Sequence, residues 1–577
     1  MNDATRITAG RPRETAQARL PDGRIFEAPP GTPLERVVAA ASRDGEPLCT
    51  AALLNGRLRE LSEPLSVDSD VVPVTVADDD GMRIYRRSLV FLLVTAAAEV
   101  FPEAQVFIEH SAASAAGYFC EVRGRAPFSQ QELARIEAHM REVVAADARI
   151  TRAQMPAHAA LEIFRSRGEE DKARLFAHRR KDTLTLYGLR GRWDYFQGYM
   201  TPSAGYLKHF ALSAYPPGFM LHFPHQRQPE SIEPTAPYPK LFAVYEEASD
   251  WLDRLGIRSA GTLNDAIAAG RLPEISLVGE ALHAARIAEI AAEIAATQGR
   301  VKLVLVAGPS SSGKTTFSKR LAVQLLARGL RPFQMSLDDY FLDRDQTPKD
   351  AGGKPDFEGL QALDVKLFND NLLELMAGRK VTLPQYSFIK GQREQGPTVL
   401  LEADNIVILE GIHGLNPSLV PGVPGDRVYR VYVSALTQLN LDRHNRVSTT
   451  DCRLIRRVVR DAAKRGYGAR DTVARWGSVT RGEKQYIFPF QENSDAVFNS
   501  ALVHELAVLR PLAEPLLLQV RPTTPEFVEV NRLLSFLQWF QPAPPDTVPD
   551  NSILREFIGG SILEGFRLWP TPTTLRG

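Results

Sequence analysis

The residues best suited to chemistry form one short glycine-rich loop. Residues 308 to 315 have the sequence Gly-Pro-Ser-Ser-Ser-Gly-Lys-Thr, which is a complete phosphate-binding motif. In such a loop the backbone N–H groups surround phosphate oxygens, the lysine reaches the β- and γ-phosphates, and the threonine hydroxyl binds Mg²⁺. The expected nucleotide contacts are Gly308, Pro309, Ser310, Ser311, Ser312, Gly313, Lys314, Thr315 and Thr316.

The elements on both sides of this loop support the motif. An apolar, β-branched run over 301–307 predicts a buried strand, and the pattern over 316–329 predicts a helix that ends at Gly329. A strand, a glycine loop and a helix in this order direct backbone N–H groups and a helix dipole at phosphate. A chance Gly/Ser turn is the alternative, and the two flanks argue against it.

Two further strands are predicted to end in carboxylates. Asp338 follows the apolar segment 332–337, and Glu410 ends the segment 404–410. Ligands of doubly wound sheets bind at the carboxyl ends of strands. A carboxylate there can accept the proton of an attacking hydroxyl or bind Mg²⁺. An acidic turn is the simpler explanation for Asp338 taken alone.

A cluster of arginines follows on a predicted helix over 453–466. Arg456, Arg457 and Arg460 fall on one face of that helix together with Arg453. Such a face can close over a triphosphate and stabilise charge on the phosphoryl group in transfer. A solvated basic helix is the alternative.

These pieces, in this order, resemble the uridine kinase and phosphoribulokinase family. The sequences AGPSSSGKTT, MSLDDYF, LPQYSF, VILEGIHGL and RRVVRDAAKRG carry the likeness over roughly 301–505. The resemblance implies a doubly wound α/β P-loop kinase domain, ATP and Mg²⁺ as cofactors, and a small hydroxyl acceptor such as a nucleoside 5′-OH. It implies Asp338 as catalytic base, Lys314, Arg456, Arg457 and Arg460 as charge-stabilising residues, and Thr315, Glu410 and Asp338 at Mg²⁺.

The same resemblance implies the acceptor site. The expected residues are Asp338, Tyr340, Glu358, Tyr386 and Arg393. The acidic segment 356–364 departs from the family pattern, with Glu358 where aspartate is usual and Gly359-Leu360 in place of His-Pro. Homo-oligomers are also common in this family.

Residues 17–78 resemble the TGS domain found at the front of threonyl-tRNA synthetases. LPDGRIFEAPPGTPLERVVAAA and AALLNGRLRELSEPLSVDSDV carry the likeness, and strand and helix patterns in them predict a small α+β roll of the β-grasp type. A TGS domain is a binding or regulatory module without chemistry of its own.

The following segment resembles the editing-like α+β domain of threonyl- and alanyl-tRNA synthetases. In that family two histidines on a helix and a later Cys and His hold zinc. The corresponding positions here are Arg87, Phe91, Phe196 and Met200. A guanidinium and two phenyl rings provide no lone pair for zinc, and a single thioether is a poor zinc ligand. We therefore expect no zinc and no editing hydrolysis. A His222–His225 metal site is the weaker of two explanations for residues 221–225, the other being an aromatic-rich strand.

Length, net charge, cysteine content and apolar runs indicate the broad class of the protein. The chain has 577 residues, which predicts several domains, and its formal net charge is zero, which gives no general reason to bind nucleic acid. Three separated cysteines fit a reducing cytoplasm, residues 1–18 lack the apolar core of a signal peptide, and the apolar run 89–98 is too short for a membrane span. The expected units are 1–16 (disordered tail), 17–78 (TGS-like), 80–230 (editing-like), 236–300 (helical linker), 301–505 (P-loop kinase-like) and 506–577 (C-terminal helical extension).

Two functions follow from these patterns. The first is an ATP- and Mg²⁺-dependent kinase for a small hydroxyl substrate, with a nucleoside or another small molecule as partner. The alternative is a nucleotide-dependent protein that binds RNA or tRNA, or that has a regulatory role, and whose kinase activity is degenerate. The TGS likeness favours the alternative, and the zero net charge disfavours a large RNA footprint.

Overall fold

The computed structural model describes residues 14–112, 117–179, 181–233, 237–350, 352–387 and 390–566. Of the expected disordered tail, residues 1–13 lie outside this description. Residues 567–577 of the expected C-terminal extension lie outside it as well. Strand β1 (Ala16–Arg19) begins inside the expected tail, so the prediction of disorder was wrong at Ala16.

The N-terminal strands form a mixed sheet crossed by one helix. Besides β1 the elements are β2 (Ile25–Ala28), α1 (Leu34–Ala41), β4 (Cys49–Leu54), β5 (Arg57–Glu60) and β7 (Ser69–Thr75), with the short pair β3 (Thr32–Pro33) and β6 (Pro64–Leu65). The strand order is β2-β1-β7-β4-β5, with β1 and β7 parallel. The helix buries Leu34, Val37 and Val38. A turn at Asp22-Gly23 joins β1 to β2, with Gly23 at a φ of 86°.

A second α+β unit follows. Its elements are α2 (Asp79–Val100), β8 (Gln105–Ala112), β9 (Gly117–Arg123), α3 (Gln130–Ala145), β10 (Thr151–Pro156), α4 (Ala157–Ser166), α5 (Glu170–Ala177), β11 (Thr183–Leu189), β12 (Arg192–Asp194), β13 (Ala211–Tyr215) and β14 (Gly218–His222). The strands form two antiparallel sheets, β13-β14-β9-β8 and β10-β11-β12. The apolar run 89–98 lies in the second half of α2, where the residues from Leu89 to Ala97 are buried. Among the described residues, neither this helix nor another has the length and apolar character needed to cross a bilayer.

Three helices then lead into the C-terminal half. They are α6 (Pro239–Leu255), α7 (Ala260–Ala268) and α8 (Leu272–Ala296). The predicted amphipathic helix over 281–296 is the second half of α8, and it buries Ile287, Ile290 and Ile294.

A parallel five-stranded sheet carries the glycine-rich loop. Its strands are β15 (Leu303–Ala307), β16 (Arg331–Ser336), β19 (Asn405–Glu410), β20 (Val428–Ser434) and β21 (Ala496–Asn499). They lie in the order β16-β19-β15-β20-β21. Alternate side chains of β15 enter different cores, Val304 and Val306 on one face and Leu303 and Leu305 on the other. Both faces are therefore covered, as predicted for a doubly wound sheet.

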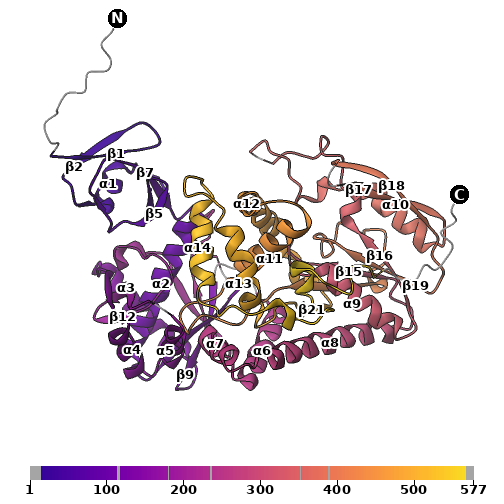
Figure 1. The fold of residues 1–577 in the computed structure, drawn as a ribbon, viewed down its shortest axis with the longest axis horizontal. Coiled ribbons are helices and arrows are strands. Elements are labelled where there is room, and N and C mark those ends of the chain that lie inside the picture. The colour runs from indigo at the N-terminus through magenta and orange to yellow at the C-terminus, as the bar shows by residue number, and fades with distance from the viewer. Residues whose placement is uncertain are drawn as a thin grey trace, which may run out of the picture.

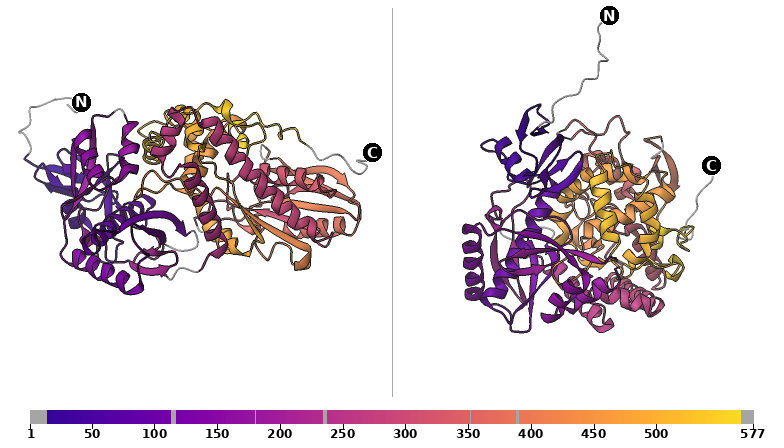
Figure 2. Two further views of the ribbon diagram at one scale, coloured as in Figure 1. Left: turned by 90° about the horizontal axis from the view of Figure 1, so that it is seen from below. Right: turned by 60° about the vertical axis from the view of Figure 1, so that its left-hand side comes forward.

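Further helices and a hairpin complete the C-terminal half. They are α9 (Lys314–Leu326), α10 (Val365–Met376), the hairpin β17 (Val381–Ser387) and β18 (Gln392–Val399), α11 (Thr449–Lys464), α12 (Ala469–Tyr486), α13 (Glu505–Leu517), α14 (Phe527–Leu537) and α15 (Arg555–Ile558). Figure 2 shows the long helix α8 running alongside the sheet, and its apolar residues share one core with α9 and α13.

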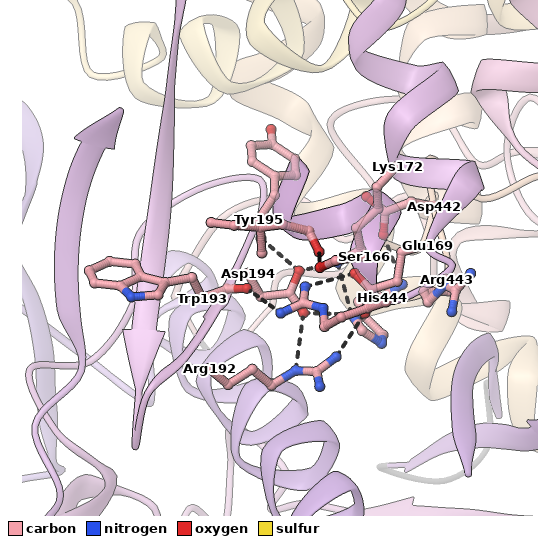
Figure 3. A network of polar contacts seen from close by, with 12 residues as sticks. Ser166, Glu169, Lys172, Arg192, Trp193, Asp194, Tyr195, Asp442, Arg443 and His444 are labelled. Atoms are coloured by element: carbon pink, nitrogen blue, oxygen red, sulfur yellow. Dashed lines mark hydrogen bonds and ion pairs between the residues drawn. The ribbon is translucent and has the colours of Figure 1, made fainter. Parts of the chain in front are cut away.

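Helices α13 and α14 lie between the N-terminal strands and the parallel sheet (Figure 1). A buried polar cluster, Lys172, Asp194 and His444, joins the second unit to the loop after β20 (Figure 3). Nδ1 of His444 lies 2.9 Å from Nζ of Lys172 and 2.9 Å from Oδ2 of Asp194. Lys172 and Asp194 form an ion pair with both side chains fully buried. Arg443, in the same loop, donates to Asp171 of α5. This cluster is therefore a buried polar junction between the two halves.

Candidate active site

The glycine-rich loop connects β15 to α9 as predicted. A Cβ at Gly308 would lie 1.9 Å from the carbonyl oxygen of Val433, so the loop can pass β20 only with glycine there. Gly313 has a φ of 89°, in the left-handed region. Helix α9 then begins at Lys314, and its first backbone N–H groups have no partner inside the helix. This end of the helix is suited to bind an anion.

Lys314 is influenced by carboxylates from four different segments, namely Glu410, Asp338, Glu556 and Glu483. Its Nζ donates to the carbonyl oxygen of Pro309 at 3.0 Å. Burial lowers the pKa of Lys314, and the charges of Glu410 and Asp338 oppose that change. The structure therefore brings together three residues that the sequence places at the ends of separate elements.

Thr315 and Glu410 form a pair that fits a Mg²⁺ site. Oγ1 of Thr315 donates to Oε1 of Glu410 at 3.2 Å. The other carboxylate oxygen of Glu410 is buried and has no hydrogen-bond partner among the residues that the structure describes. Burial raises the pKa of this carboxyl to about 7. Because Mg²⁺ usually takes one or two protein oxygens together with water and phosphate oxygens, this pair fits the ion. These two residues would hold it.

Asp338 lies just beyond β16, in a short 3₁₀ turn over Leu337–Tyr340. Burial raises its pKa, while the charges of Lys314, Arg465 and Arg460 lower it. The neighbouring Asp339 accepts the backbone N–H of Tyr386 at 3.2 Å. Asp338 is thus the carboxylate of this turn that faces the cations of the glycine-rich loop and of the following helices.

The predicted arginine helix is α11, but its arginines have different surroundings. Arg457 donates to Oγ of Ser310 at 2.8 Å, and Arg460 donates to Asp461 at 2.9 Å. Arg456 has no exposed surface, and it contacts Glu505 and donates to the carbonyl oxygen of Ser500 at 2.8 Å. This geometry does not favour Arg456 as a residue that closes over phosphate. Its catalytic role stays a prediction, as do those of the other two.

A buried ion pair that no sequence motif indicates also supports the loop. Oε1 of Glu483, on α12, accepts the backbone N–H of Ser310 at 3.0 Å. Glu483 also pairs with Arg453, and both side chains are 1% exposed. Arg453 donates in turn to the carbonyl oxygen of Ser310 at 2.9 Å. A buried ion pair from two helices therefore holds Ser310 in place. The acidic residue of this pair, Glu483, lies outside every motif that the sequence analysis identified.

The expected acceptor residues are spread over a wider area. Tyr340 is buried in the core, with its ring 5.2 Å from that of Phe368. Arg393 is ion-paired with Asp364 at 2.8 Å. Tyr386 packs against Phe341, with ring centroids 5.7 Å apart.

Glu358 is influenced by the charge of the candidate base, Asp338. Burial raises the pKa of Glu358 to about 7, and the charges of Glu483 and Asp338 add to that effect.

A cavity of about 590 Å³ lies between α9, β16 and the β17–β18 hairpin. Thr315, Asp339 and Glu410 form part of its polar wall, and Phe333, Met335 and Leu383 are among its apolar residues. The cavity therefore adjoins the candidate Mg²⁺ site.

The four positions without zinc ligands are filled by ordinary packing. Arg87 donates to the carbonyl oxygen of Tyr199 at 2.7 Å, and the rings of Phe91 and Phe196 are 5.1 Å apart. Met200 is buried. Within the residues that the structure describes, no three His, Cys, Asp or Glu side chains are grouped to hold a metal ion. His222 Nε2 contacts Oγ of Ser213 at 2.7 Å.

Comparison with known proteins separates the two halves of the chain. Residues 303–507 match the model of the "Phosphoribulokinase / Uridine kinase family". The N-terminal half is homologous to threonine–tRNA ligases. The enzyme of Nitrosomonas eutropha is 34% identical over 200 residues, which are 34% of this chain and 30% of that protein. That of Pelobacter propionicus is 29% identical over 236 residues, 41% of this chain and 36% of that protein. The chain thus spans about a third of the length of these curated relatives.

Solved structures show likeness over part of the chain as well. A structure titled "Possible Uridine Kinase", from Bacillus stearothermophilus, shares 18% identity and covers 34% of this chain and 88% of that one, with a TM-score of 0.24. D-glycerate 3-kinase from Cryptococcus neoformans shares 19% identity over 43% of this chain and 80% of that one, with a TM-score of 0.18. The family match and the parallel sheet together identify residues 303–507 as a kinase-type P-loop domain.

Proposed function

We propose that the protein transfers the γ-phosphoryl group of ATP to the hydroxyl of a small molecule, in a reaction that depends on Mg²⁺. The observation that carries this proposal is the register of the parallel sheet. Glu410 lies opposite Val306, just before the glycine-rich loop that contains Lys314, and opposite Ser336, two residues before Asp338. A lysine for phosphate, a carboxylate for metal and a carboxylate for the acceptor proton are the parts that phosphoryl transfer needs.

Each of these groups would have a separate role in phosphoryl transfer. Bound Mg²⁺ would neutralise charge on the phosphates. Lys314 would bind the β- and γ-phosphates, and Arg457 and Arg460 would face the negative charge from α11. Asp338 would orient the acceptor hydroxyl and take its proton while the oxygen bonds to phosphorus and ADP leaves. Positioning and electrostatics would supply most of the rate.

The acceptor we propose is a nucleoside, phosphorylated on its 5′-hydroxyl. The match to the uridine kinase and phosphoribulokinase family supports this choice. Glu358 supports it as well, because a carboxylate beside the candidate base can accept hydrogen bonds from sugar hydroxyls.

Acceptor-dependent ADP release tests the proposal. The purified chain would be given ATP, Mg²⁺ and, in turn, a panel of nucleosides, ribulose 5-phosphate and pantothenate. We expect turnover with one nucleoside and its loss in Lys314→Ala. Absence of turnover with every acceptor, with ATP still bound, would reject the kinase function.

For the N-terminal half we propose a TGS-like β-grasp domain followed by an editing-like domain that has lost its zinc site. The similarity to threonine–tRNA ligases and the strand order β2-β1-β7-β4-β5 support this assignment. The same similarity favours tRNA binding as a second candidate function. A filter-binding assay with total tRNA at physiological salt tests it, and retention below micromolar protein concentration would support it.

A further inference from the structure

The segment 549–564, called here the tail segment, packs against the glycine-rich loop. Ile553 and Phe557 have no exposed surface. A Cβ at Gly313 would lie 2.5 Å from Cγ2 of Ile553, and Arg456 lies 5.0 Å from the ring centre of Phe557. Lys319 of α9 also donates to the carbonyl oxygen of Leu563 at 2.7 Å. The tail segment is therefore a fixed wall of the candidate nucleotide site.

One carboxylate of this wall occupies the anion-binding end of α9. Oε2 of Glu556 accepts the backbone N–H of Thr316 at 3.1 Å and its Oγ1–H at 2.9 Å. Thr316 is the third residue of α9, so its N–H is one of those left unpaired at a helix start. Such N–H groups are the donors that a loop of this type offers to phosphate oxygens. The carboxylate oxygen thus lies where a phosphate oxygen would bind.

Glu556 differs from the other carboxylate that binds this loop. Glu483 is fully buried and paired with Arg453, so it is a permanent support. Glu556 is only partly buried, and among the described residues its contacts are with Thr316 and no cation pairs with it. Its carboxylate therefore places a negative charge at the start of α9, where an arriving phosphate would have to displace it.

We propose that Glu556 is an internal, displaceable ligand of the phosphate-binding loop, and that it weakens nucleotide binding until a phosphate oxygen takes its place on Thr316. The buried side chains Ile553 and Phe557 keep the backbone of the tail segment fixed, so the exchange requires rotation of the Glu556 side chain alone. This inference rests on the proposed nucleotide site, which the loss of ATP binding in Lys314→Ala tests separately.

Calorimetric titration with ATP and Mg²⁺ tests the proposal. We expect Glu556→Gln and Glu556→Ala to bind ATP about fivefold or more tightly than the unchanged chain, because the competing charge is gone. Glu564→Gln is the matched control. It removes one charge from the same segment, its carboxylate pairs with Lys464 at 3.1 Å and is 60% exposed, and we expect its affinity to stay within about twofold. Unchanged or weaker binding in both Glu556 variants would overturn the proposal.

A structure of the unchanged chain with ADP and Mg²⁺ decides the matter even if the variants do not fold. We expect a phosphate oxygen on the N–H of Thr316 and the carboxylate of Glu556 turned away. A carboxylate still within hydrogen-bond distance of Thr316 beside a bound nucleotide would overturn the proposal.

Discussion

At the scale of single residues, Asp338 is the group whose chemistry can be isolated most cleanly. Its carboxylate lies near Lys314 and Arg460, and the amide of Asp338→Asn keeps its shape without its basicity. We expect turnover to fall about 10²–10⁴-fold, the usual contribution of a general base. The affinity for ATP should stay within about threefold.

The control for this measurement is Asp370→Asn, which removes an exposed carboxylate of α10 that pairs with Lys366. Steady-state kinetics and ATP titration of both variants provide the comparison. Turnover of Asp338→Asn close to that of the control would exclude Asp338 as the base.

Glu410 supports a second prediction at this scale. Its unpaired buried oxygen and its contact with Thr315 place it at the candidate Mg²⁺ site. In Glu410→Gln we expect the half-saturating Mg²⁺ concentration to rise roughly tenfold or more, which corresponds to a loss of about 1.4 kcal/mol. Titration of activity with Mg²⁺ at saturating ATP measures it. An unchanged Mg²⁺ requirement would place the metal elsewhere.

At the scale of elements, the Arg453–Glu483 pair fastens α11 and α12 to the glycine-rich loop. Removing one partner of a buried pair leaves the other charge unpaired and costs about 3–5 kcal/mol. We therefore expect Glu483→Ala to lower the apparent unfolding temperature by about 6 °C or more, and to weaken ATP binding because Ser310 loses its support.

Glu514→Ala is the matched control, since the Arg510–Glu514 pair is partly exposed on α13 and such pairs contribute about 0.3–0.5 kcal/mol. Differential scanning calorimetry of the two variants measures the effect. Equal shifts would show that the buried pair does not support the loop.

The same scale shows what could be predicted from the sequence. The sequence was sufficient to predict β15, the glycine-rich loop and α9, because the motif and the hydrophobic periodicity agree there. The carboxylates at the ends of β16 and β19 could be located because parallel strands bring their ends to one edge. Glu483 and Glu556 could not be found, since each depends on a helix that returns to the loop from far along the chain. The burial of Arg456 could not be predicted either. Helical spacing shows which residues share a face of the helix, but it does not show which of them a neighbouring helix covers.

At the scale of the whole molecule, the Lys172–Asp194–His444 cluster joins the two halves. Lys172 and His444 hold the pKa of the buried Asp194 well below its usual range. Burial lowers the pKa of His444 to about 4. The loop that contains His444 leads directly into Ser448, which caps α11. Disturbance of this junction would therefore reach the helix that carries Arg457 and Arg460.

This junction should make stability depend on pH. In the unfolded chain His444 binds a proton near its ordinary pKa, whereas in the folded chain it does so only near pH 4. Its contribution to the free energy of unfolding is therefore complete above about pH 6.5 and is lost as the pH falls toward 4. The total loss is about 3 kcal/mol. We expect His444→Asn to be less stable at pH 7 and to lose less stability than the unchanged chain on going to pH 5.

Other buried histidines also weaken the fold in acid, so the difference between variants is the quantity to measure. His158→Asn, at an exposed position of α4, is the control and should leave the pH dependence unchanged. Thermal unfolding at pH 7, 6 and 5 supplies the data. A pH dependence in His444→Asn equal to that of the unchanged chain would contradict this role.

The central claim is that this molecule moves a phosphoryl group to a small hydroxyl compound. The most direct test is mass spectrometry of the acceptor after incubation with ATP carrying an isotopic label in its γ-phosphoryl group, Mg²⁺ and a nucleoside panel. We predict one nucleoside that gains a labelled phosphoryl group on its 5′-oxygen with the unchanged chain and not with Lys314→Ala. Label found only in inorganic phosphate, with every nucleoside unmodified, would contradict the claim.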